Sequence, residues 1–353
     1  MSSEWKSQVC EIRCKQDLLG GSVSDFIVKP MTATDADQLV ALVRKCYGDG
    51  YPNKILYNPQ EIAAALSNGL MRSVVSLNGA GELIGHCALS FSDQSAPVPE
   101  AGKMVVDPDC RGQHLSNRLA EHRKEIAVEH DLLGYWSECV TNHPFSQHEI
   151  IDSGGMETGA FIAKDAPTWH MAGVNNVTDV RLSLMTYFIR LKDVPERVIY
   201  LPARYATFTE QLAEGLEISR HIVQKADAVA MSTAYSYSVN PGNQFAQIVV
   251  STLGTDVGEV VAGLVGRLEQ EGIQVFHLDI PLNTSNALLA ISELEALGFF
   301  WAAWMPEFSE SGDVLRLQKT DAPVNPAEIV CAREHGEIIK KHILDERQRV
   351  MKL

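Results

Sequence analysis

Apolar residues in the first half of the chain recur at two spacings, which predict strands and helices in turn. Short apolar runs bounded by Gly, Pro and Asn predict strands at residues 25–29, 71–77, 83–91, 102–106, 135–140 and 181–190. Apolar positions three and four apart predict helices at residues 34–46, 61–66, 115–130 and 146–152. Hairpins are thus mixed with a β-α-β crossover. We expect an α/β (α+β) fold, a mixed twisted sheet flanked by helices.

The second half of the chain repeats this pattern. It predicts strands at residues 198–201, 228–239, 245–253, 275–280, 299–304 and 314–318, and helices at residues 209–223, 257–271 and 287–297. From residue 245 onward the order β-α-β-α-β-β matches the end of the first half, which indicates an internal structural duplication with little sequence identity. We therefore expect two similar domains, at residues 22–192 and 197–322, with a linker around residues 192–196.

The C-terminal residues 325–353 carry a narrow apolar stripe. Its positions are three and four apart, and they are Ile329, Ala332, Gly336, Ile339 and Ile343. This spacing predicts a charged helix over residues 326–351 with one buried face. We expect this helix to pack against a domain or against a partner subunit.

Composition excludes some classes of protein. The net charge of −15 gives no basic face for gripping phosphates, so we expect no nucleic-acid partner. No apolar run approaches the roughly 20 residues of a membrane span, and the first residues lack a secretory signal pattern. The acidity suits a cationic substrate such as an amine, although it also simply keeps a protein in solution.

Cysteine usage indicates a reducing compartment. The seven cysteines are odd in number and scattered, and several fall in predicted core strands, so we expect reduced thiols and a cytoplasmic location. Cys10 and Cys14 are four positions apart, but no second pair of Cys or His follows at zinc-site spacing. We therefore expect no metal.

One stretch, residues 106–116, combines features that bind a phosphate. Pro108 ends the preceding strand, and a helix follows whose first amides and positive dipole end attract an anion. Arg111 adds a fixed positive group, and Gly112 permits a turn without a Cβ clash. The sequence therefore predicts a turn that holds a pyrophosphate at the helix N-terminus.

This stretch resembles the acetyl-CoA motif of the GNAT N-acetyltransferase superfamily, written [RQ]-x-x-G-x-[GA] after a strand. Arg111, Gly112, Gln113 and Leu115 fit, whereas His114 stands where a second glycine is expected and Ser116 where Gly or Ala is expected. His114 places a Cβ against the pyrophosphate, or else its imidazole bonds a phosphate. The order of elements over residues 25–190 adds to the resemblance.

The resemblance implies that acetyl-CoA is the co-substrate and that its acetyl group passes directly to an amine. Main-chain groups of Met104, Val105 and Val106 would pair with the pantetheine arm, and the turn from Arg111 to Ser116 would hold the pyrophosphate. Asn142 matches the asparagine that the family carries near its fourth helix. A cofactor site formed in this way needs no metal.

The attacking amine must lose a proton, so a carboxylate or a water chain is expected near the thioester. Glu100, six residues before Val106, is the first candidate, and Glu138 on the next strand is the second. His86 lies in an apolar strand, where a lone histidine is more often a satisfied core residue. Three tyrosines lie in a loop that often covers the acceptor in this fold, namely Tyr47, Tyr51 and Tyr57.

The acid that protonates the departing CoA thiolate has no clear candidate. The family's tyrosine would lie seven residues after Asn142, where this chain has Glu149, or Ile150 in the neighbouring register. His143 and His148 remain as alternatives, and each is equally suited to a helix cap or the surface.

The second half resembles the same superfamily more faintly. Residues 294–300 look like the Gly-Phe helix end of that fold, but the turn at residues 253–258 lacks the arginine and glycines, and its Asp256 would repel a phosphate. We expect a degenerate GNAT-like domain without CoA binding, which builds the acceptor site or mimics a dimer partner. The chain itself is then a monomer or a homodimer.

Two hypotheses follow. The first is an acetyl-CoA-dependent N-acetyltransferase acting on a primary amine of a small molecule or a protein, with transfer of a longer acyl group as a variant. The second is a non-catalytic CoA-binding or regulatory protein on the same fold, which the departures at His114 and Ser116 and the missing tyrosine favour.

Overall fold

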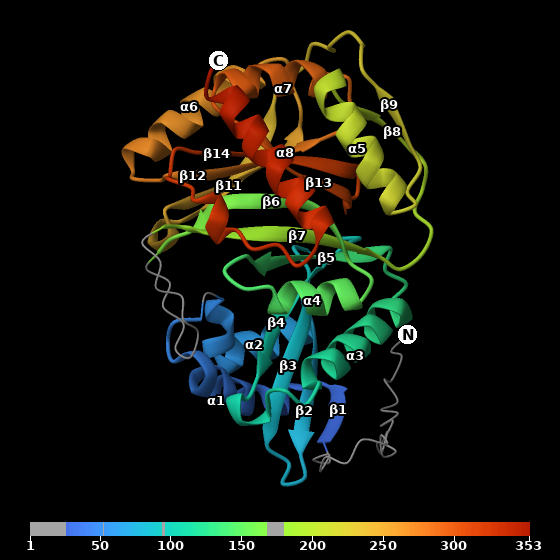
Figure 1. Cartoon of the computed structure of the whole chain (residues 1–353), viewed down its shortest axis with the longest axis vertical. Helices are drawn as coiled ribbons and strands as arrows, with labels where there is room; N and C mark the ends of the chain where they lie inside the picture. The colour runs from blue at the N-terminus through green and yellow to red at the C-terminus, as the bar shows by residue number, and fades with distance from the viewer. Residues whose placement is uncertain (1–25, 52, 94–95, 168–179) are drawn as a thin grey trace. The chain divides into compact units, whose positions relative to one another are not determined.

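The structure is a computed structural model that describes residues 26–51, 53–93, 96–167 and 180–353 (Figure 1). These residues divide into two compact units. Unit 1 holds residues 26–93 and 100–131 apart from residue 52, and unit 2 holds residues 96–99, 132–167 and 180–353. Cys10 and Cys14, and the start of the expected first domain, lie outside the described residues. Every described helix is too short or too polar to cross a bilayer.

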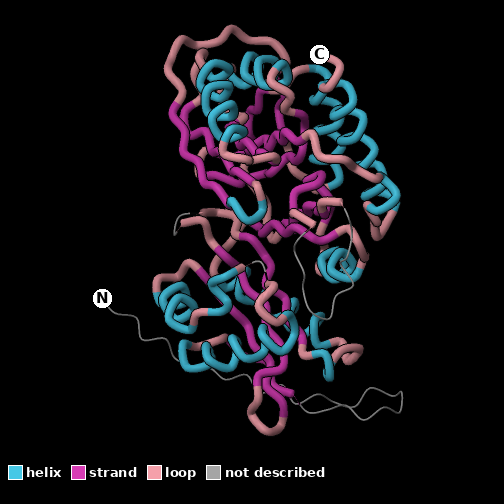
Figure 2. The backbone as a smooth tube through the Cα atoms, turned by 90° about the vertical axis from the view of Figure 1, so that its left-hand side faces the viewer, coloured by secondary structure: helices cyan, strands magenta, loops and turns pink. Residues whose placement is uncertain are grey.

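Unit 1 is an antiparallel sheet between helices (Figure 2). Its strands, in hydrogen-bonded order, are β1 (Phe26–Pro30), β2 (Met71–Asn78), β3 (Leu83–Ser90) and β4 (Glu100–Val106). Its helices are α1 (Ala36–Tyr47), α2 (Pro59–Ser67) and α3 (Leu115–Glu129). α1 and α2 cover one face, around Val75 and Val105, and α3 covers the other, around Val74 and Cys87. Buried and half-buried residues alternate along β4, because successive side chains of a strand point to opposite faces and the face under α1 and α2 is covered more completely.

Unit 2 is a larger mixed sheet in the order β5-β7-β6-β13-β14-β12-β11-β10. Its strands are β5 (Gly134–Val140), β6 (Met156–Asp165), β7 (Leu182–Arg190), β10 (Ala234–Asn240), β11 (Phe245–Thr252), β12 (Val275–Pro281), β13 (Phe300–Ser309) and β14 (Gly312–Thr320). β8 (Arg197–Tyr200) and β9 (Arg220–Val223) form a separate parallel pair. The helices are α4 (Phe145–Asp152), α5 (Ala203–Gly215), α6 (Val257–Gln270), α7 (Asn286–Ala296) and α8 (Glu334–Val350).

The strand order of unit 2 is mirrored about the β6–β13 pair. On one side the chain runs β5-α4-β6-β7 and the strands lie in the order β5-β7-β6, and on the other it runs β12-α7-β13-β14 with the order β12-β14-β13. The two halves meet closely, because a Cβ on Gly159 would lie 2.3 Å from the Ala302 carbonyl oxygen. Gln318 ties them together by accepting from the Ile162 amide and donating to the Ala160 carbonyl.

Most elements lie where the sequence predicted them, but four predictions were wrong. The strand expected at residues 228–239 begins only at Ala234. β6 was missed, since its small residues make a continuous buried run with no alternation. The helix expected at residues 209–223 is instead α5 followed by β9. The chain turns at Glu217, whose φ of 54° is a conformation that glycine usually adopts at such turns. The C-terminal helix begins only at Glu334, after an extended Arg333.

The apolar stripe of α8 faces the sheet of unit 2. Figure 1 shows α8 running across the strands, and it packs on β6 and β13. Ile339 and Ile343 are fully buried, and Ile329, which precedes the helix, is also buried. The predicted packing of this helix against a domain is therefore confirmed.

Candidate active site

The predicted phosphate turn joins β4 to α3 in unit 1. After Val106 the chain makes a 3-10 turn at Pro108–Cys110, and α3 begins at Leu115. The Asp107 carboxylate accepts a hydrogen bond from the Asp109 amide at 3.0 Å. The Lys45 ammonium donates to the carboxylates of Asp107 and Asp109, each at 2.8 Å. These bonds raise the pKa of Lys45 above its ordinary value. Lys45, which the sequence did not single out, therefore neutralises the acidic start of the turn.

Four residues of this turn are exposed, namely Arg111, Gly112, Gln113 and His114. No described residue makes a hydrogen bond or an ion pair with the Arg111 guanidinium. The His114 side chain caps none of the first amides of α3. This helix start therefore presents its first amides and the Arg111 cation to solvent. Uncapped first-turn amides attract anions, so an anion is expected to bind here.

Two residues of the turn adopt positive φ. Gly112 has a φ of 78°, and no described atom lies within 4 Å of an added Cβ, so the backbone conformation and not space demands glycine. His114 has a φ of 57° in the left-handed region. This explains a glycine at that position of the motif, and it shows that the chain keeps the turn with a histidine at a cost in conformational energy.

Replacing His114 with glycine is expected to stabilise the protein by about 0.5–1 kcal/mol. A side chain in the left-handed region costs roughly 1–2 kcal/mol, and the greater freedom of glycine in the unfolded chain offsets part of that gain. Urea unfolding followed by circular dichroism measures the change. His114→Ala keeps the Cβ and should show no gain, and equal gains from both variants would contradict the assignment of strain.

The hydrophobic face of α3 fixes the turn against the sheet. Leu115 and Leu119 are buried against β3, and a Cβ on Gly85 would come within 2.9 Å of the Leu119 side chain. The helix start therefore lies close to the end of β4. Ser116, the other departure from the motif, is half-buried and bonds only the neighbouring Asn117 side chain among the described residues.

Glu100, the first candidate base, begins β4. Its carboxylate is one-third exposed and lies 3.8 Å from the Lys103 ammonium, which also donates to the Ser90 hydroxyl at 2.6 Å. Burial raises the pKa of Tyr51 far above its ordinary value, and the charges of Tyr47 and Glu100 add to the shift. Unit 1 therefore brings Glu100 near the tyrosines.

The three tyrosines of unit 1 form an ordered loop. Tyr47 and Tyr51 stack with their ring centroids 5.0 Å apart. The Tyr57 hydroxyl accepts from the Tyr51 amide and donates to the Gly48 carbonyl, both at 2.8 Å. The loop is therefore held by its own hydrogen bonds and packs against the core of unit 1, where the charge of Glu100 acts on Tyr51.

The other catalytic candidates lie in unit 2. Glu138 on β5 accepts two hydrogen bonds from the Lys164 ammonium, at 2.6 and 2.5 Å, so its carboxylate is engaged in an ion pair. Asn142 and His143 follow β5, and burial lowers the pKa of His143, which keeps its imidazole neutral near pH 7. A neutral imidazole suits a base better than an acid. His148 is exposed on α4.

Beside Lys164, the buried Asp165 should make stability depend on pH. Burial raises the pKa of Asp165 to about 6. The native state then holds a proton that the unfolded state releases near pH 4, so stability is lost as pH rises from about 4 to about 6. In Asp165→Asn, the fall in the free energy of unfolding over this pH range should be smaller by roughly 1–3 kcal/mol. Urea unfolding at pH 4.5 and 7 tests it, and an unchanged pH dependence would contradict it.

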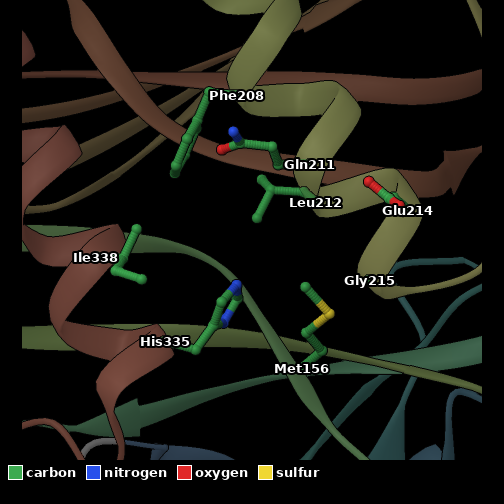
Figure 3. Close-up of a pocket in the computed structure, with 8 residues that line it drawn as sticks. All are labelled: Met156, Phe208, Gln211, Leu212, Glu214, Gly215, His335 and Ile338. Carbon is green, nitrogen blue, oxygen red and sulfur yellow. The ribbon is translucent and has the colours of Figure 1, made fainter.

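A pocket of about 340 Å³ lies in unit 2 between α5 and α8. Figure 3 shows Phe208, Leu212 and Ile338 around it with Met156 and His335. The His335 Nδ1 atom lies 2.8 Å from the buried Glu157 carboxylate, which also pairs with Arg333. None of the predicted site residues lines this pocket, so it is separate from the chemistry of the turn.

Residues 36–148 match the family model described as the acetyltransferase (GNAT) family. These residues therefore form a GNAT acetyltransferase domain, the domain of a GNAT-type N-acetyltransferase. The GNAT fold predicted for the first half of the chain is thereby confirmed, and acyl transfer is the general activity of the class. No curated protein matches the chain.

Solved structures that match part of this chain include three acetyltransferases. A spermidine N-acetyltransferase chimera of the Vibrio cholerae and human enzymes is 13% identical, with 47% of this chain and 96% of that chain covered and a TM-score of 0.38. The ribosomal-protein-S18-alanine N-acetyltransferase from Escherichia coli is 13% identical, with 48% and 97% covered and a TM-score of 0.39. An IAA acetyltransferase from Bacillus cereus is 12% identical, with 47% and 100% covered and a TM-score of 0.37.

Proposed function

We propose that this protein transfers an acetyl group from acetyl-CoA directly to a primary amine of a small molecule or a protein. The observation that carries the proposal is the turn of unit 1. There the exposed Arg111, the positive-φ Gly112 and the uncapped start of α3 form a site for a pyrophosphate. The main chain of β4 from Met104 to Val106 would pair with the pantetheine arm.

Glu100 is the proposed general base. Its carboxylate is partly exposed beside the tyrosine loop, whereas the Glu138 carboxylate is held by Lys164. The acid that protonates the CoA thiolate stays unassigned, because burial lowers the pKa of His143 and keeps this candidate neutral near pH 7. The charge of Glu100 also suits the positive charge of an approaching amine.

Glu100→Gln should lower kcat/KM for an amine by about 10²–10³-fold, because the amide cannot take a proton from the amine. The affinity for acetyl-CoA should stay within about threefold, since Glu100 lies away from the phosphate turn. Release of free CoA, detected through its thiol, measures turnover, and calorimetry measures the binding of acetyl-CoA. Glu121→Gln, an exposed carboxylate on α3, serves as control. Unchanged turnover in the Glu100 variant would assign the base elsewhere.

We propose further that residues 197–322 are a second, degenerate GNAT-like domain. The mirrored strand order about β6 and β13 supports this, as does the equivalence of β11-α6-β12-α7 to β4-α3-β5-α4 in the order of elements. The first domain then spans residues 22–192 and the C-terminal helix lies within residues 325–353. The division into compact units falls between β4 and β5, inside the proposed first domain.

The chain itself fills the crevice of the second domain. β11 and β12 are parallel neighbours, and ligands of such sheets bind beyond the carboxyl ends of the strands. There the buried Asn286 side chain bonds both the amide and the carbonyl of Val229, at 2.6 and 2.9 Å. The Thr255 amide donates to the Met231 carbonyl, and Asp256 accepts from the amide and hydroxyl of Thr233.

The packing of residues 229–233 in the second domain is evidence that each chain binds a single acetyl-CoA. A Cβ on Gly254 would lie 2.4 Å from the Thr233 amide nitrogen, so glycine permits the close approach of residues 229–233. The Thr255 amide and the Asn286 side chain are thus already bonded within the chain, and Asp256 adds a negative charge. We therefore propose that only the turn of unit 1 binds acetyl-CoA.

A second candidate function is a non-catalytic CoA-binding or regulatory protein. The observation in its favour is the strained His114 in the turn, together with Glu149 where the family has its tyrosine. Release of CoA with a broad panel of amines separates the two functions. Tight binding of acetyl-CoA without turnover on any amine would favour this second function.

A further inference from the structure

β4 carries a bulge within its pairing to β3. His86 pairs with Val105 and Ala88 with Gly102, so Lys103 and Met104 together stand opposite the single residue Cys87. Lys103 has a φ of 55°, in the left-handed region. A bulge of this kind removes one residue from the ladder and leaves its carbonyl in need of another partner.

The imidazole of His86 supplies that partner. His86 is fully buried, and its Nδ1 atom lies 2.8 Å from the Lys103 carbonyl oxygen. Its Nε2 atom lies 3.1 Å from the Ser73 hydroxyl. Burial lowers the pKa of His86 to about 4, so the ring is neutral near pH 7. The neutral ring donates a hydrogen bond from Nδ1 to the Lys103 carbonyl and accepts one at Nε2 from the Ser73 hydroxyl.

The orientation of one peptide group follows from this bond. In a trans peptide the C=O and the N–H point in opposite directions. With the Lys103 carbonyl held by His86, the Met104 N–H must point away from the imidazole. The side chain of Lys103 is also held, since it is buried and donates to Ser90.

We propose that His86 is a positioning residue for acetyl transfer, which acts by fixing the Met104 N–H in the direction of the thioester carbonyl. This inference rests on the proposed function, in which the main chain of β4 binds the thioester. A fixed donor costs no reorganisation when negative charge develops on the carbonyl oxygen, so its loss affects kcat more than binding.

Two substitutions of similar size separate this role from packing. In His86→Asn the side-chain amide can still donate from the position of Nδ1, whereas in His86→Gln it is displaced toward Ser73. Both leave a smaller polar group in the same buried site, so urea unfolding should show similar losses of stability. Ser73→Ala serves as a control that leaves the bond to the Lys103 carbonyl in place.

Steady-state kinetics with acetyl-CoA and an amine substrate gives the test. His86→Gln should lower kcat by about 10–100-fold with KM for acetyl-CoA within about threefold, while His86→Asn and Ser73→Ala should keep kcat within about threefold. Equal losses of kcat in the Asn and Gln variants, or a change in KM alone, would overturn the role of His86. Absence of turnover in the wild type would overturn the proposed function, and the inference with it.

Discussion

Replacing Gly112 with aspartate should weaken acetyl-CoA binding by at least about 100-fold. The residue lies at the exposed turn before α3, where the proposal places the pyrophosphate. The substitution puts a carboxylate beside the phosphates and a Cβ on a backbone with a φ of 78°. A change of 100-fold corresponds to about 2.7 kcal/mol, which an unpaired like charge in a phosphate site readily supplies.

The chain offers a closely matched control for this substitution. Gly81 in the β2–β3 turn has a φ of 81° and equally open surroundings, so Gly81→Asp adds the same charge and the same strain away from the turn. Isothermal titration should give an unchanged dissociation constant for Gly81→Asp. Arg111→Ala should weaken binding by about 10-fold, as expected for one charge-assisted bond. Binding by Gly112→Asp within about threefold of the wild type would show that acetyl-CoA does not use this turn.

Replacing Arg220 with leucine should destabilise unit 2 by about 3–5 kcal/mol. The Arg220 side chain is 1% exposed and bonds the Asp313 carboxylate at 2.7 and 2.9 Å. It also pairs with Glu307, which is itself 1% exposed, at 2.8 Å. Removal of the guanidinium leaves Asp313 buried with no cation among its described partners, although the Trp304 ring N–H still donates to it.

Urea unfolding measures this loss of stability. Arg267→Leu, on the exposed face of α6, makes the same chemical change in the same unit and should alter the free energy of unfolding by less than about 0.5 kcal/mol. A similar small effect in both variants would show that the buried carboxylates find other partners. A loss of several kcal/mol from Arg220→Leu alone supports the network as the link between β9 and the β13–β14 hairpin.

The sequence could predict the turn of unit 1 because its signal is local. The arginine, the glycine and the helix that they precede lie within about ten residues, and strand and helix periodicity frames them. The same local patterns placed nearly all of the helices and the hairpin of β2 and β3. The left-handed backbone of His114 could not be predicted, since only the structure reveals that the position requires positive φ.

Contacts between distant residues account for what the sequence missed. Arg220 stands within a predicted helix, and its partners Glu307 and Asp313 lie 87 and 93 residues away. Glu138 looked like a free strand carboxylate until Lys164, 26 residues later, was found to hold it. His86 was recognised as a core histidine, but its bond to the bulge carbonyl depends on the register of β3 and β4. Register is set by tertiary packing and leaves no short motif.

Titration of the full-length wild-type protein with acetyl-CoA tests the central claim most directly. The account predicts saturable binding of one acetyl-CoA per chain, because the turn of unit 1 is open and residues 229–233 fill the crevice of the second domain. Absence of binding at millimolar ligand would contradict the assignment of the turn. Two equivalents per chain would contradict the closed second crevice.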